Sequence, residues 1–462
     1  MVRHQPSLCV LHDEGRCGSC PHLDTPPGDQ LEAKQARVAA LLKDYVPAGA
    51  WQPPCPSSPT HFRNKAKMVV AGTSRHPTLG ILDAVGRGTD LRSCPLHVPA
   101  VRDALPVLAD LVTGTGIAPY DVPGRRGELK HVLVTASPDE DLMVRFVLRS
   151  SRHVSDLRDA LPDLRRRLPQ LAVASVNIQP VHQAVIEGPD EIVLTEEDRL
   201  LMRLRLPPPG ATAAQARPSG SDAPGGQARP HELLLHLPPR SFFQTNTAVA
   251  QTLYATARDW AEDIGPGGAA GQPPARVQDL FCGVGGFALA LAGPGRRVQG
   301  VEVSEAAVSG ARDSARLMRL DPGTVRFDSG DARALDLLEG PAAEGEGSHL
   351  LVVNPPRRGL GPDLARRIEA CGVPRVLYSS CSPASLAADL GQMPSLRVRR
   401  ARLFDMFPHT DHAEVLVELA RTQASPGSCP SPAQAPSIRA QAPSSARAAR
   451  TSSRRASTRS SW

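Results

Sequence analysis

Residues 277–292 read VQDLFCGVGGFALALA. The apolar run at the start predicts a short strand, the glycines predict a tight turn, and the apolar residues after them predict the start of a helix. Asp279, Gly283, Gly285 and Gly286 lie at this turn. Because glycine has no side chain, it lets the backbone come close to a ligand at the helix N-terminus. The stretch therefore predicts a ligand site at the end of a strand.

Acidic residues follow at the ends of the next predicted elements. VQGVEVSEAA (298–307) ends its strand at Glu302, whose carboxylate can accept both hydroxyls of a ribose. Asp331 in DSGDARAL (328–335) is a candidate for the adenine side of the same pocket. The glycine-rich turn alone would also fit a dinucleotide dehydrogenase, but the G-x-G-x-x-G spacing is absent. The motifs downstream decide between these interpretations.

Alternating strands and helices extend this unit over residues 241–420. The alternation predicts a doubly wound, mostly parallel sheet of the α/β class. The last two strand-like runs, 400–407 and 413–420, fall close together and predict a hairpin at the sheet edge. The other expected strands are 277–281, 297–303, 350–356 and 375–381, and the expected helices are 304–318 and 361–371.

Three other regions accompany this unit. Residues 1–98 are loop-rich and contain many Cys, Pro and His residues. Residues 99–240 predict a central α+β domain of antiparallel strands, with a Pro- and Gly-rich flexible insertion at 207–230. Residues 421–462 have the composition of a disordered basic tail. Within the central domain, the expected strands are 131–137, 142–150 and 174–181, and the expected helix is 155–171.

The net charge of +6 comes from the end of the chain. Residues 421–462 contain seven Arg and no Lys, Asp or Glu, which leaves 46 basic against 47 acidic residues elsewhere. Bulk charge therefore says little about nucleic-acid binding by the folded part. There is no run of about 18 apolar residues that would predict a membrane span. The N-terminus lacks the apolar core of a secretory signal, so we expect a cytoplasmic monomer.

Three of the nine cysteines form the pattern C-x7-C-x2-C at Cys9, Cys17 and Cys20, and Cys94 follows in DLRSCPLH. Four thiolates can hold a tetrahedral zinc ion or an iron–sulfur cluster. Unrelated buried thiols are the simpler interpretation, but three cysteines so close together in a loop-rich segment are difficult to place in a core. Spacing alone leaves zinc and iron–sulfur both open.

The stretch LLVVNPPRRGLG predicts a strand that stops at two prolines. Proline cannot continue a sheet, so the chain must turn sharply after Asn354. Ligands bind at this edge of a doubly wound sheet. Arg357 and Arg358 follow the prolines and are suited to contact a phosphate.

A thiol and a carboxylate are predicted at the same edge. RVLYSSCSPAS (375–385) places Cys381 at the tip of its strand, and HAEVLVEL (412–419) contains Glu414 just after His412. Such a pair suits a nucleophile and a base. A buried structural cysteine and a surface carboxylate on an edge strand are the simpler alternatives. The position at a strand tip favours function for Cys381.

Six stretches, in this order, resemble the bacterial uracil-C5 RNA methyltransferases. With the cysteine pattern they cover nearly all of residues 1–420. The resemblance implies a class I S-adenosylmethionine-dependent methyltransferase fold, preceded by an N-terminal iron–sulfur and α+β RNA-binding region. The matching stretches are FRNKAKMVV (62–70), SFFQTNTAVA (241–250), DLFCGVGGF (279–287), VNPPRRGLG (353–361), YSSC (378–381) and HAEVLVEL (412–419).

The resemblance also implies roles for individual residues. It implies that Cys381 is the nucleophile and Glu414 the proton acceptor. The implied contacts to S-adenosylmethionine are Gln244, Phe281, Glu302 and Asn354. The implied ligands of a [4Fe–4S] cluster are Cys9, Cys17, Cys20 and Cys94.

These roles agree with the chemistry of the reaction. Carbon 5 of uracil is too poor a nucleophile to take a methyl group unaided. A thiolate that adds to carbon 6 turns the ring into an enolate, and carbon 5 can then attack the sulfonium methyl. A base must remove the proton from carbon 5 before the thiolate leaves. The scheme needs one cysteine, one base and one methyl donor close together.

Within the family, the sequence is most similar to members that act on 23S rRNA at the uridine of the exit-tunnel hairpin loop, uracil-747 in the usual numbering. Cys9 lies close to the first residue of the sequence, so we expect no counterpart of the N-terminal RNA-binding β-barrel of a larger relative. Asn354 stands where many relatives have Asp, and Gly286 stands where the larger relative has Asn. The expected RNA contacts are Arg63, Lys65, Lys67, Arg357 and Arg358.

Other substrates and another class of protein are the alternatives. Another 23S rRNA site and tRNA are the alternative substrates, although the tRNA enzyme lacks the cysteine cluster. A non-catalytic iron–sulfur RNA-binding protein would not need Cys381 and Glu414. A DNA cytosine methyltransferase has proline before its nucleophile, whereas Ser380 precedes Cys381 here.

Overall fold

The computed structural model describes residues 8–182, 186–208, 231–262, 275–333 and 349–422. The predicted insertion at 207–230 and the predicted tail at 421–462 lie almost wholly outside the described residues. Within the described part of the chain, no helix is long and apolar enough to cross a membrane.

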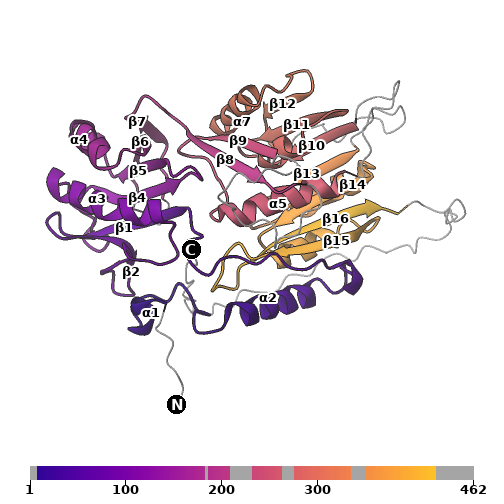
Figure 1. Cartoon of the computed structure of the whole chain (residues 1–462), viewed down its shortest axis with the longest axis horizontal. Coiled ribbons are helices and arrows are strands. Elements are labelled where there is room, and N and C mark those ends of the chain that lie inside the picture. The colour runs from indigo at the N-terminus through magenta and orange to yellow at the C-terminus, as the bar shows by residue number, and fades with distance from the viewer. Residues whose placement is uncertain (1–7, 183–185, 209–230, 263–274, 334–348, 423–462) are drawn as a thin grey trace, which may run out of the picture. The chain divides into compact units, whose positions relative to one another are not determined.

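A seven-stranded sheet of the α/β class forms the C-terminal part of the fold (Figure 1), in the order β12-β11-β10-β13-β14-β16-β15. Neighbouring strands from β12 to β14 are parallel, and β16 is antiparallel to both β14 and β15. This confirms the predicted doubly wound sheet and the predicted terminal hairpin. The strands are β10 (Ala275–Leu280), β11 (Arg296–Glu302), β12 (Val325–Ser329), β13 (Leu350–Val353), β14 (Arg375–Ser380), β15 (Leu396–Phe404) and β16 (Glu414–Arg421).

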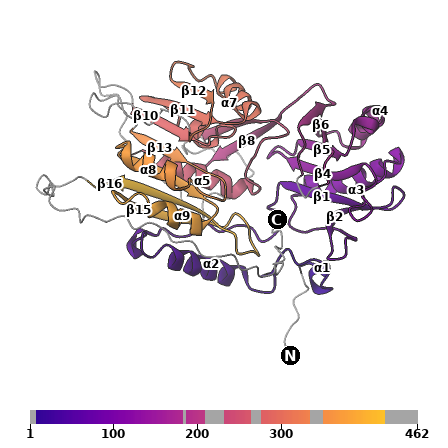
Figure 2. The ribbon, with the colours of Figure 1, turned by 180° about the vertical axis from the view of Figure 1, so that it is seen from behind.

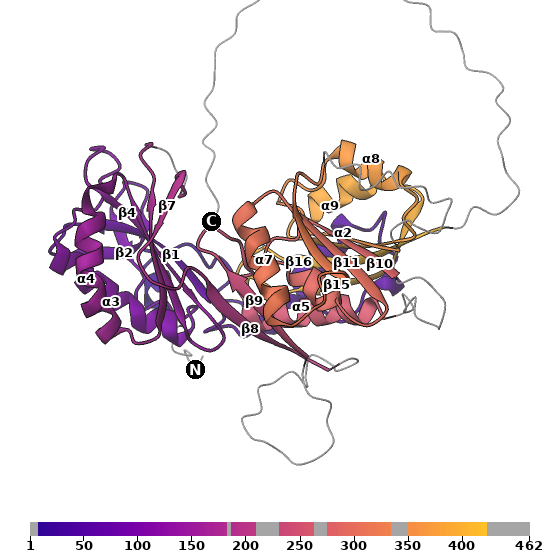
Figure 3. The same cartoon turned by 90° about the horizontal axis from the view of Figure 1, so that it is seen from above.

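Helices cover both faces of this sheet (Figure 3). Val352 packs into the core on one face and Val353 into the core on the other, as expected for a strand that is buried on both sides. The first face is covered by α5 (Thr247–Trp260), α6 (Gly286–Leu291) and α7 (Glu305–Leu317). The second face is covered by α8 (Pro362–Ala370), α9 (Pro383–Leu390) and the N-terminal helix α2 (Pro27–Leu41).

Side-chain caps explain where several of these helices begin. The side chain of Ser304 accepts a hydrogen bond from the backbone N–H of Ala307 at the start of α7. Ser382 caps α9 in the same way, and Pro383 occupies its first position. Both are preferred residues at these positions. The cap at Ser382 directly follows Cys381, so it fixes the chain just after the predicted nucleophile.

A second seven-stranded sheet has the order β3-β2-β1-β4-β5-β6-β7, with α3 (Pro99–Thr115) and α4 (Val154–Arg167) on one face. It confirms the predicted α+β arrangement, except that β5 and β6 are parallel because α4 connects them. Strands from both sides of residue 98 share this sheet. The strands are β1 (Lys65–Gly72), β2 (Pro77–Leu82), β3 (Gly88–Asp90), β4 (Leu129–Ala136), β5 (Leu142–Leu148), β6 (Leu171–Ile178) and β7 (Asp190–Val193).

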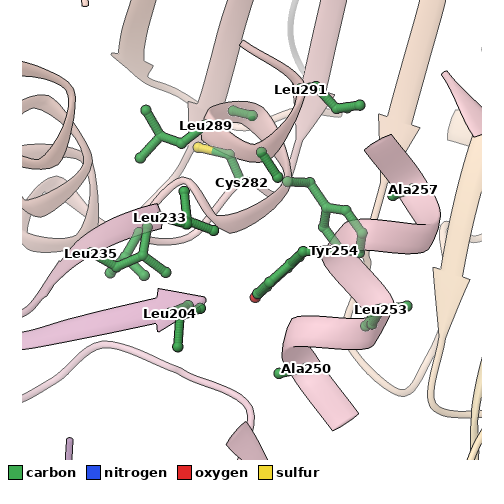
Figure 4. Close-up of a cluster of buried hydrophobic side chains, with 14 of the residues drawn as sticks. Leu204, Leu233, Leu235, Ala250, Leu253, Tyr254, Ala257, Cys282, Leu289 and Leu291 are labelled. Atoms are coloured by element: carbon green, nitrogen blue, oxygen red, sulfur yellow. The ribbon is translucent and has the colours of Figure 1, made fainter. Parts of the chain in front are cut away.

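A separate hairpin packs on the first face of the C-terminal sheet. It consists of β8 (Leu200–Leu206) and β9 (His231–Leu237), and its alternate leucines enter the core formed with α5 and α6 (Figure 4). The predicted 207–230 insertion connects these two strands. The remaining short elements are α1 (Val10–Asp13), η1 (Ala48–Ala50) and η2 (Ser151–His153).

Candidate active site

Side chains from five strands meet at one edge of the C-terminal sheet. The parallel strands β10, β11, β13 and β14 all end there. The antiparallel strand β16 begins there, because Ser380 at the end of β14 pairs with Val415 near the start of β16. Ligands bind at this edge in doubly wound sheets. The predicted site residues at the edge are Phe281, Glu302, Asn354, Cys381 and Glu414.

The turn after β10 depends on unusual backbone conformations. The φ angles are 66° at Phe281, 54° at Gly283 and 88° at Gly285, all in the left-handed region. Glycine adopts such angles at little cost, whereas Phe281 is an uncommon case. A Cβ added to Gly286 would lie 2.5 Å from the hydroxyl oxygen of Tyr254. The glycines predicted for this turn are therefore required by its geometry.

Asp279 is fully buried beneath this turn. Its Oδ2 accepts a 2.9 Å hydrogen bond from the N–H of Ala288, while its Oδ1 has no hydrogen-bond partner among the described residues. Burial raises the pKa of Asp279 to about 8, and the charge of Glu302 adds to the rise. Because a buried oxygen without a partner is costly, this oxygen is suited to interact with a polar group of a ligand at the turn.

Glu302 is tied to two loops at the tip of β11. Its Oε2 accepts a hydrogen bond from the N–H of Gly283 at 3.2 Å, and its Oε1 accepts one from the N–H of Ser304 at 3.0 Å. The side chain is half-buried. The carboxylate therefore has a fixed position next to the glycine-rich turn.

Gln244 lies on a turn that is held by hydrogen bonds from Asn64, the residue before β1. The side-chain amide of Asn64 donates to the backbone oxygen of Gln244 at 3.0 Å and to the hydroxyl of Thr247 at 2.8 Å. The backbone N–H of Asn64 donates to Thr245 at 2.9 Å. Asn64 and Gln244 are both buried. Asn64 therefore fixes the turn that carries a predicted methyl-donor contact.

The loop after β13 is held by an aspartate from α9. Asn354 is half-buried at the start of this loop. The buried carboxylate of Asp389 accepts hydrogen bonds from the N–H of Leu360 at 2.8 Å, the N–H of Gly361 at 3.1 Å and the hydroxyl of Tyr378 at 2.6 Å. One carboxylate thus joins the loop after β13 to the strand that leads to the predicted nucleophile.

Cys381 is half-buried and lies between groups of opposite charge. Burial and the neighbouring charge of Glu414 raise the pKa of its thiol. The charge of Arg357, and a hydrogen bond from its guanidinium, lower that pKa. The structure therefore brings the predicted nucleophile and the predicted base together, and adds a cation beside the sulfur.

Glu414 is buried at the first position of β16. The hydroxyl of Ser379 donates a hydrogen bond to its Oε1. Burial raises the pKa of Glu414 to about 7, and the bond from Ser379 opposes this rise. A carboxylate with such a pKa can accept a proton near neutral pH.

Arg357 contacts the loop that leads into β16. Its Nη2 lies 2.9 Å from Nδ1 of His412, and the ring nitrogen must accept because a guanidinium has only donors. Burial and the charge of Arg357 lower the pKa of His412, which favours the neutral ring. The next residue, Arg358, is exposed. Arg357 is exposed as well, so both arginines predicted to contact phosphate are accessible to solvent.

Three of the N-terminal cysteines act electrostatically on the fourth, Cys20. Burial raises the pKa of Cys20 to about 12, and negative charge on Cys94, Cys17 and Cys9 adds to the rise. None of the four forms a disulfide. Among the residues that the structure describes, no group of three or more His, Cys, Asp or Glu is placed to hold a metal ion.

The basic residues of the first segment lie in two environments. Arg63 is half-buried, and the charges of Cys94 and Cys20 act on it. Lys65 is half-buried, and burial together with the charges of Lys67 and Arg145 lowers its pKa to about 8. Lys67 is exposed. Only part of this predicted RNA-contact cluster is therefore freely accessible to solvent.

Sequence reasoning missed several residues that hold the site together. Asn64 and Ser379 each hold a predicted site residue through a hydrogen bond, and Asp389 holds the loop after β13 that begins at Asn354. Ser379 lies in the quoted YSSC stretch. Its position opposite β16 follows only from the way β14 and β16 pair in the sheet. Asp331 is exposed and accepts the N–H of Arg333 at 2.9 Å, so its predicted adenine contact stays a prediction.

Comparison with known proteins gives relatives over most of the chain. The 23S rRNA (uracil(747)-C(5))-methyltransferase RlmC of Halothiobacillus neapolitanus is 44% identical over 423 residues, which are 90% of this chain and 100% of the relative. The protein of the same name from Escherichia coli O139:H28 is 41% identical over 414 residues, which are 89% of this chain and 99% of the relative.

A family model and a solved structure agree with these relatives. The model described as tRNA (Uracil-5-)-methyltransferase matches residues 229–422. The crystal structure of Pyrococcus abyssi tRNA (uracil-54, C5)-methyltransferase with S-adenosyl-L-homocysteine is 22% identical and has a TM-score of 0.66, over 91% of this chain and 88% of that chain. It supports the fold. Because full-length relatives exceed two-fifths identity, the chain belongs to the RlmC family of uracil-C5 RNA methyltransferases.

Proposed function

We propose that this protein transfers a methyl group from S-adenosylmethionine to carbon 5 of a uridine in 23S rRNA, at the position numbered 747 in the names of its relatives. The observation that carries the proposal is the meeting of Cys381 and Glu414 at one sheet edge, where the end of β14 pairs with the start of β16 and the charge of Glu414 acts on the thiol of Cys381. This is the pair that a covalent route to carbon 5 requires.

In the proposed reaction, Cys381 loses its proton to solvent and its sulfur bonds to carbon 6 of the uracil. The electrons of the C5–C6 double bond then give an enolate, and carbon 5 takes the methyl group. When bound, S-adenosylmethionine supplies this methyl as a sulfonium substituent and leaves as the homocysteine thioether. Glu414 removes the proton from carbon 5, the double bond reforms, and the thiolate of Cys381 leaves.

The residues at the edge fit the methyl donor. Glu302, fixed between two loops, is suited to accept the ribose hydroxyls. Phe281 and the glycine-rich turn bring the backbone close to the ligand, and Asp279 has an oxygen without a partner among the described residues. Gln244 and Asn354 are the proposed polar contacts on either side. These five residues bind and orient the donor.

A [4Fe–4S] cluster on Cys9, Cys17, Cys20 and Cys94 is the second part of the proposal. The C-x7-C-x2-C pattern with Cys94 supports it, since four thiolates can hold such a cluster, and the charges of Cys9, Cys17 and Cys94 act on Cys20. Such a cluster would join the N-terminal segment to the loop after β3 and take no part in the chemistry. Anaerobically purified protein should contain about four irons per chain, which Cys20→Ser should remove and Cys371→Ser should not.

The deciding experiment offers 23S rRNA and tRNA transcripts to the purified protein and maps any product by mass spectrometry. The proposal expects 5-methyluridine at position 747 of the 23S rRNA. Methylation of tRNA alone would replace this substrate with the one named in the family model. A 23S fragment with 5-fluorouridine at the target should trap Cys381 covalently. The base can remove a proton from carbon 5 but cannot remove fluorine, so the thiolate cannot leave. Absence of both product and adduct would reject the enzyme proposal.

A further inference from the structure

The loop before β16 contacts helix α2 at one end and the surroundings of Cys381 at the other. This loop, residues 405–412, ends two residues before Glu414. Helix α2 lies alongside the β15–β16 hairpin and contacts α9 (Figures 1 and 2). The contacts between α2 and the loop are polar and mostly buried, so they fix the loop's conformation rather than only covering it.

Two residues of α2 hold the middle of the loop. The side-chain oxygen of Gln30 accepts the backbone N–H of His409 at 2.9 Å, and its amide nitrogen lies 3.1 Å from Nδ1 of the same ring. Lys34 forms a 2.5 Å ion pair with Asp405 and donates to the backbone oxygen of Phe407 at 3.0 Å. His409 has a φ of 63°, an uncommon conformation for a residue other than glycine. The surrounding contacts therefore keep the loop in a conformation that its sequence does not prefer.

The end of the loop reaches the reactive sulfur through one arginine. The ring of Phe407 packs edge-on against the ring of His412, with centroids 6.1 Å apart. His412 in turn contacts Arg357 at 2.9 Å. Arg357 lies in the loop after β13 and Cys381 directly follows β14, and these neighbouring parallel strands end at the same sheet edge, where the charge of Arg357 acts on the thiol. The groups that face this thiol are thus Arg357 from the loop after β13, Glu414 from β16 and Tyr378 from β14 itself.

We propose that Arg357 is a catalytic residue that stabilises the thiolate of Cys381, and that Gln30 and Lys34 are positioning residues for it through the loop 405–412. This goes beyond a phosphate contact for Arg357, and it rests on the proposed function only in taking Cys381 as the nucleophile. Burial and Glu414 both oppose ionisation of the sulfur. The positive charge of Arg357 offsets both effects, because a nearby cation stabilises a thiolate.

The test measures alkylation of Cys381 by iodoacetamide over a range of pH, without RNA or methyl donor, in the full-length protein. The rate is read at the Cys381 peptide by mass spectrometry. Arg357→Gln should raise the midpoint by about one pH unit, so that alkylation below it slows about tenfold. Arg357→Lys should keep most of the wild-type rate because it keeps the charge. Arg366→Gln, at an exposed arginine of α8, should leave the profile unchanged.

Gln30→Leu tests the positioning part of the proposal. It should raise the midpoint in the same direction by a smaller amount. Added to Arg357→Gln, it should cause no further rise, because both changes act through one contact. Cys371 is half-buried at the C-terminus of α8, and its alkylation in the same samples reports whether each variant is folded.

Three results would overturn the inference. An unchanged Cys381 profile in folded Arg357→Gln would assign this arginine to RNA binding alone. An unchanged profile in folded Gln30→Leu would show that α2 does not position Arg357. A fully additive double variant would show the same. Because no RNA is present, these outcomes are separate from failure of the 5-fluorouridine adduct, which would reject Cys381 as the nucleophile.

Discussion

The hydroxyl of Ser379 donates a hydrogen bond to the carboxylate of Glu414 across the antiparallel pair β14 and β16. Ser379 is two residues before Cys381 on the same strand. One short stretch therefore supplies the proposed nucleophile and also the partner of the proposed base. Because the bond stabilises the charged carboxylate, it lowers a pKa that burial raises.

Ser379→Ala should shift the acid limb of the methyl-transfer pH profile upward. Glu414 accepts a proton only when charged, so activity should rise with pH through its pKa of about 7. Loss of the hydrogen bond should raise that pKa further, by about one unit. Rates measured from acidic to alkaline pH check the shift. Ser314→Ala, which removes another buried serine hydroxyl away from the edge, is the control and should not move the limb.

Glu414→Gln should trap the reaction after methyl transfer. The amide cannot take the proton from carbon 5, so the bond between Cys381 and carbon 6 should persist. Turnover should fall roughly 100- to 10,000-fold. A protein–RNA band that survives denaturing electrophoresis with ordinary RNA and methyl donor checks this outcome. Cys381→Ala should give neither band nor product. Wild-type turnover by Glu414→Gln would show that another group is the base.

Asn64→Ala should weaken binding of the methyl donor. The change removes the hydrogen bonds that fix the turn of Gln244 and leaves its backbone oxygen without that partner. We expect the Kd for S-adenosylmethionine to rise about tenfold, measured by calorimetry without RNA. Asn177→Ala removes a buried asparagine of the second sheet with comparable hydrogen bonds, and should leave this Kd unchanged. Equal losses in both variants would point to general destabilisation.

Lys34→Met should destabilise the protein by breaking a buried ion pair. The side chains of Lys34 and Asp405 are only 3% and 8% exposed. Removing one partner leaves a buried charge, which costs about 3–5 kcal/mol. Denaturation in urea, followed by circular dichroism, measures the loss. Lys43→Met, at an exposed position, should change the free energy of unfolding by less than about 0.5 kcal/mol. Adding Asp405→Leu to Lys34→Met should recover part of the loss.

Periodicity and strand-end motifs predicted most of the C-terminal sheet. Apart from β12, the parallel strands contain short runs of Val and Leu that end at polar or glycine-rich turns, so the shared edge could be inferred without coordinates. Cys381 and Glu414 were predicted in this way, and the structure places both at this edge. The turn at Gly283 and Gly285 was also predictable, because few residues other than glycine adopt its backbone angles.

The supporting contacts could not be predicted, because they join residues far apart in the sequence. Asn64 reaches Gln244, and Gln30 reaches His409, across separations that no local pattern encodes. The position of the hairpin β8–β9 had the same difficulty. Its leucines predict one buried face, but only the packing shows that α5 covers it. The role of Arg357 beside Cys381 likewise depends on the path of two loops.

The position of β16 inside the sheet has a consequence for biosynthesis. Translation delivers Cys381 long before the segment that begins at Glu414, and this late segment must insert between two earlier neighbours, β14 and β15. In a nascent chain that ends before residue 414, the edge of β14 that pairs with β16 is uncovered, and Cys381 at the end of β14 lacks Glu414. The pairing of β16 with β14 therefore completes the sheet and, in the same step, brings Glu414 to Cys381.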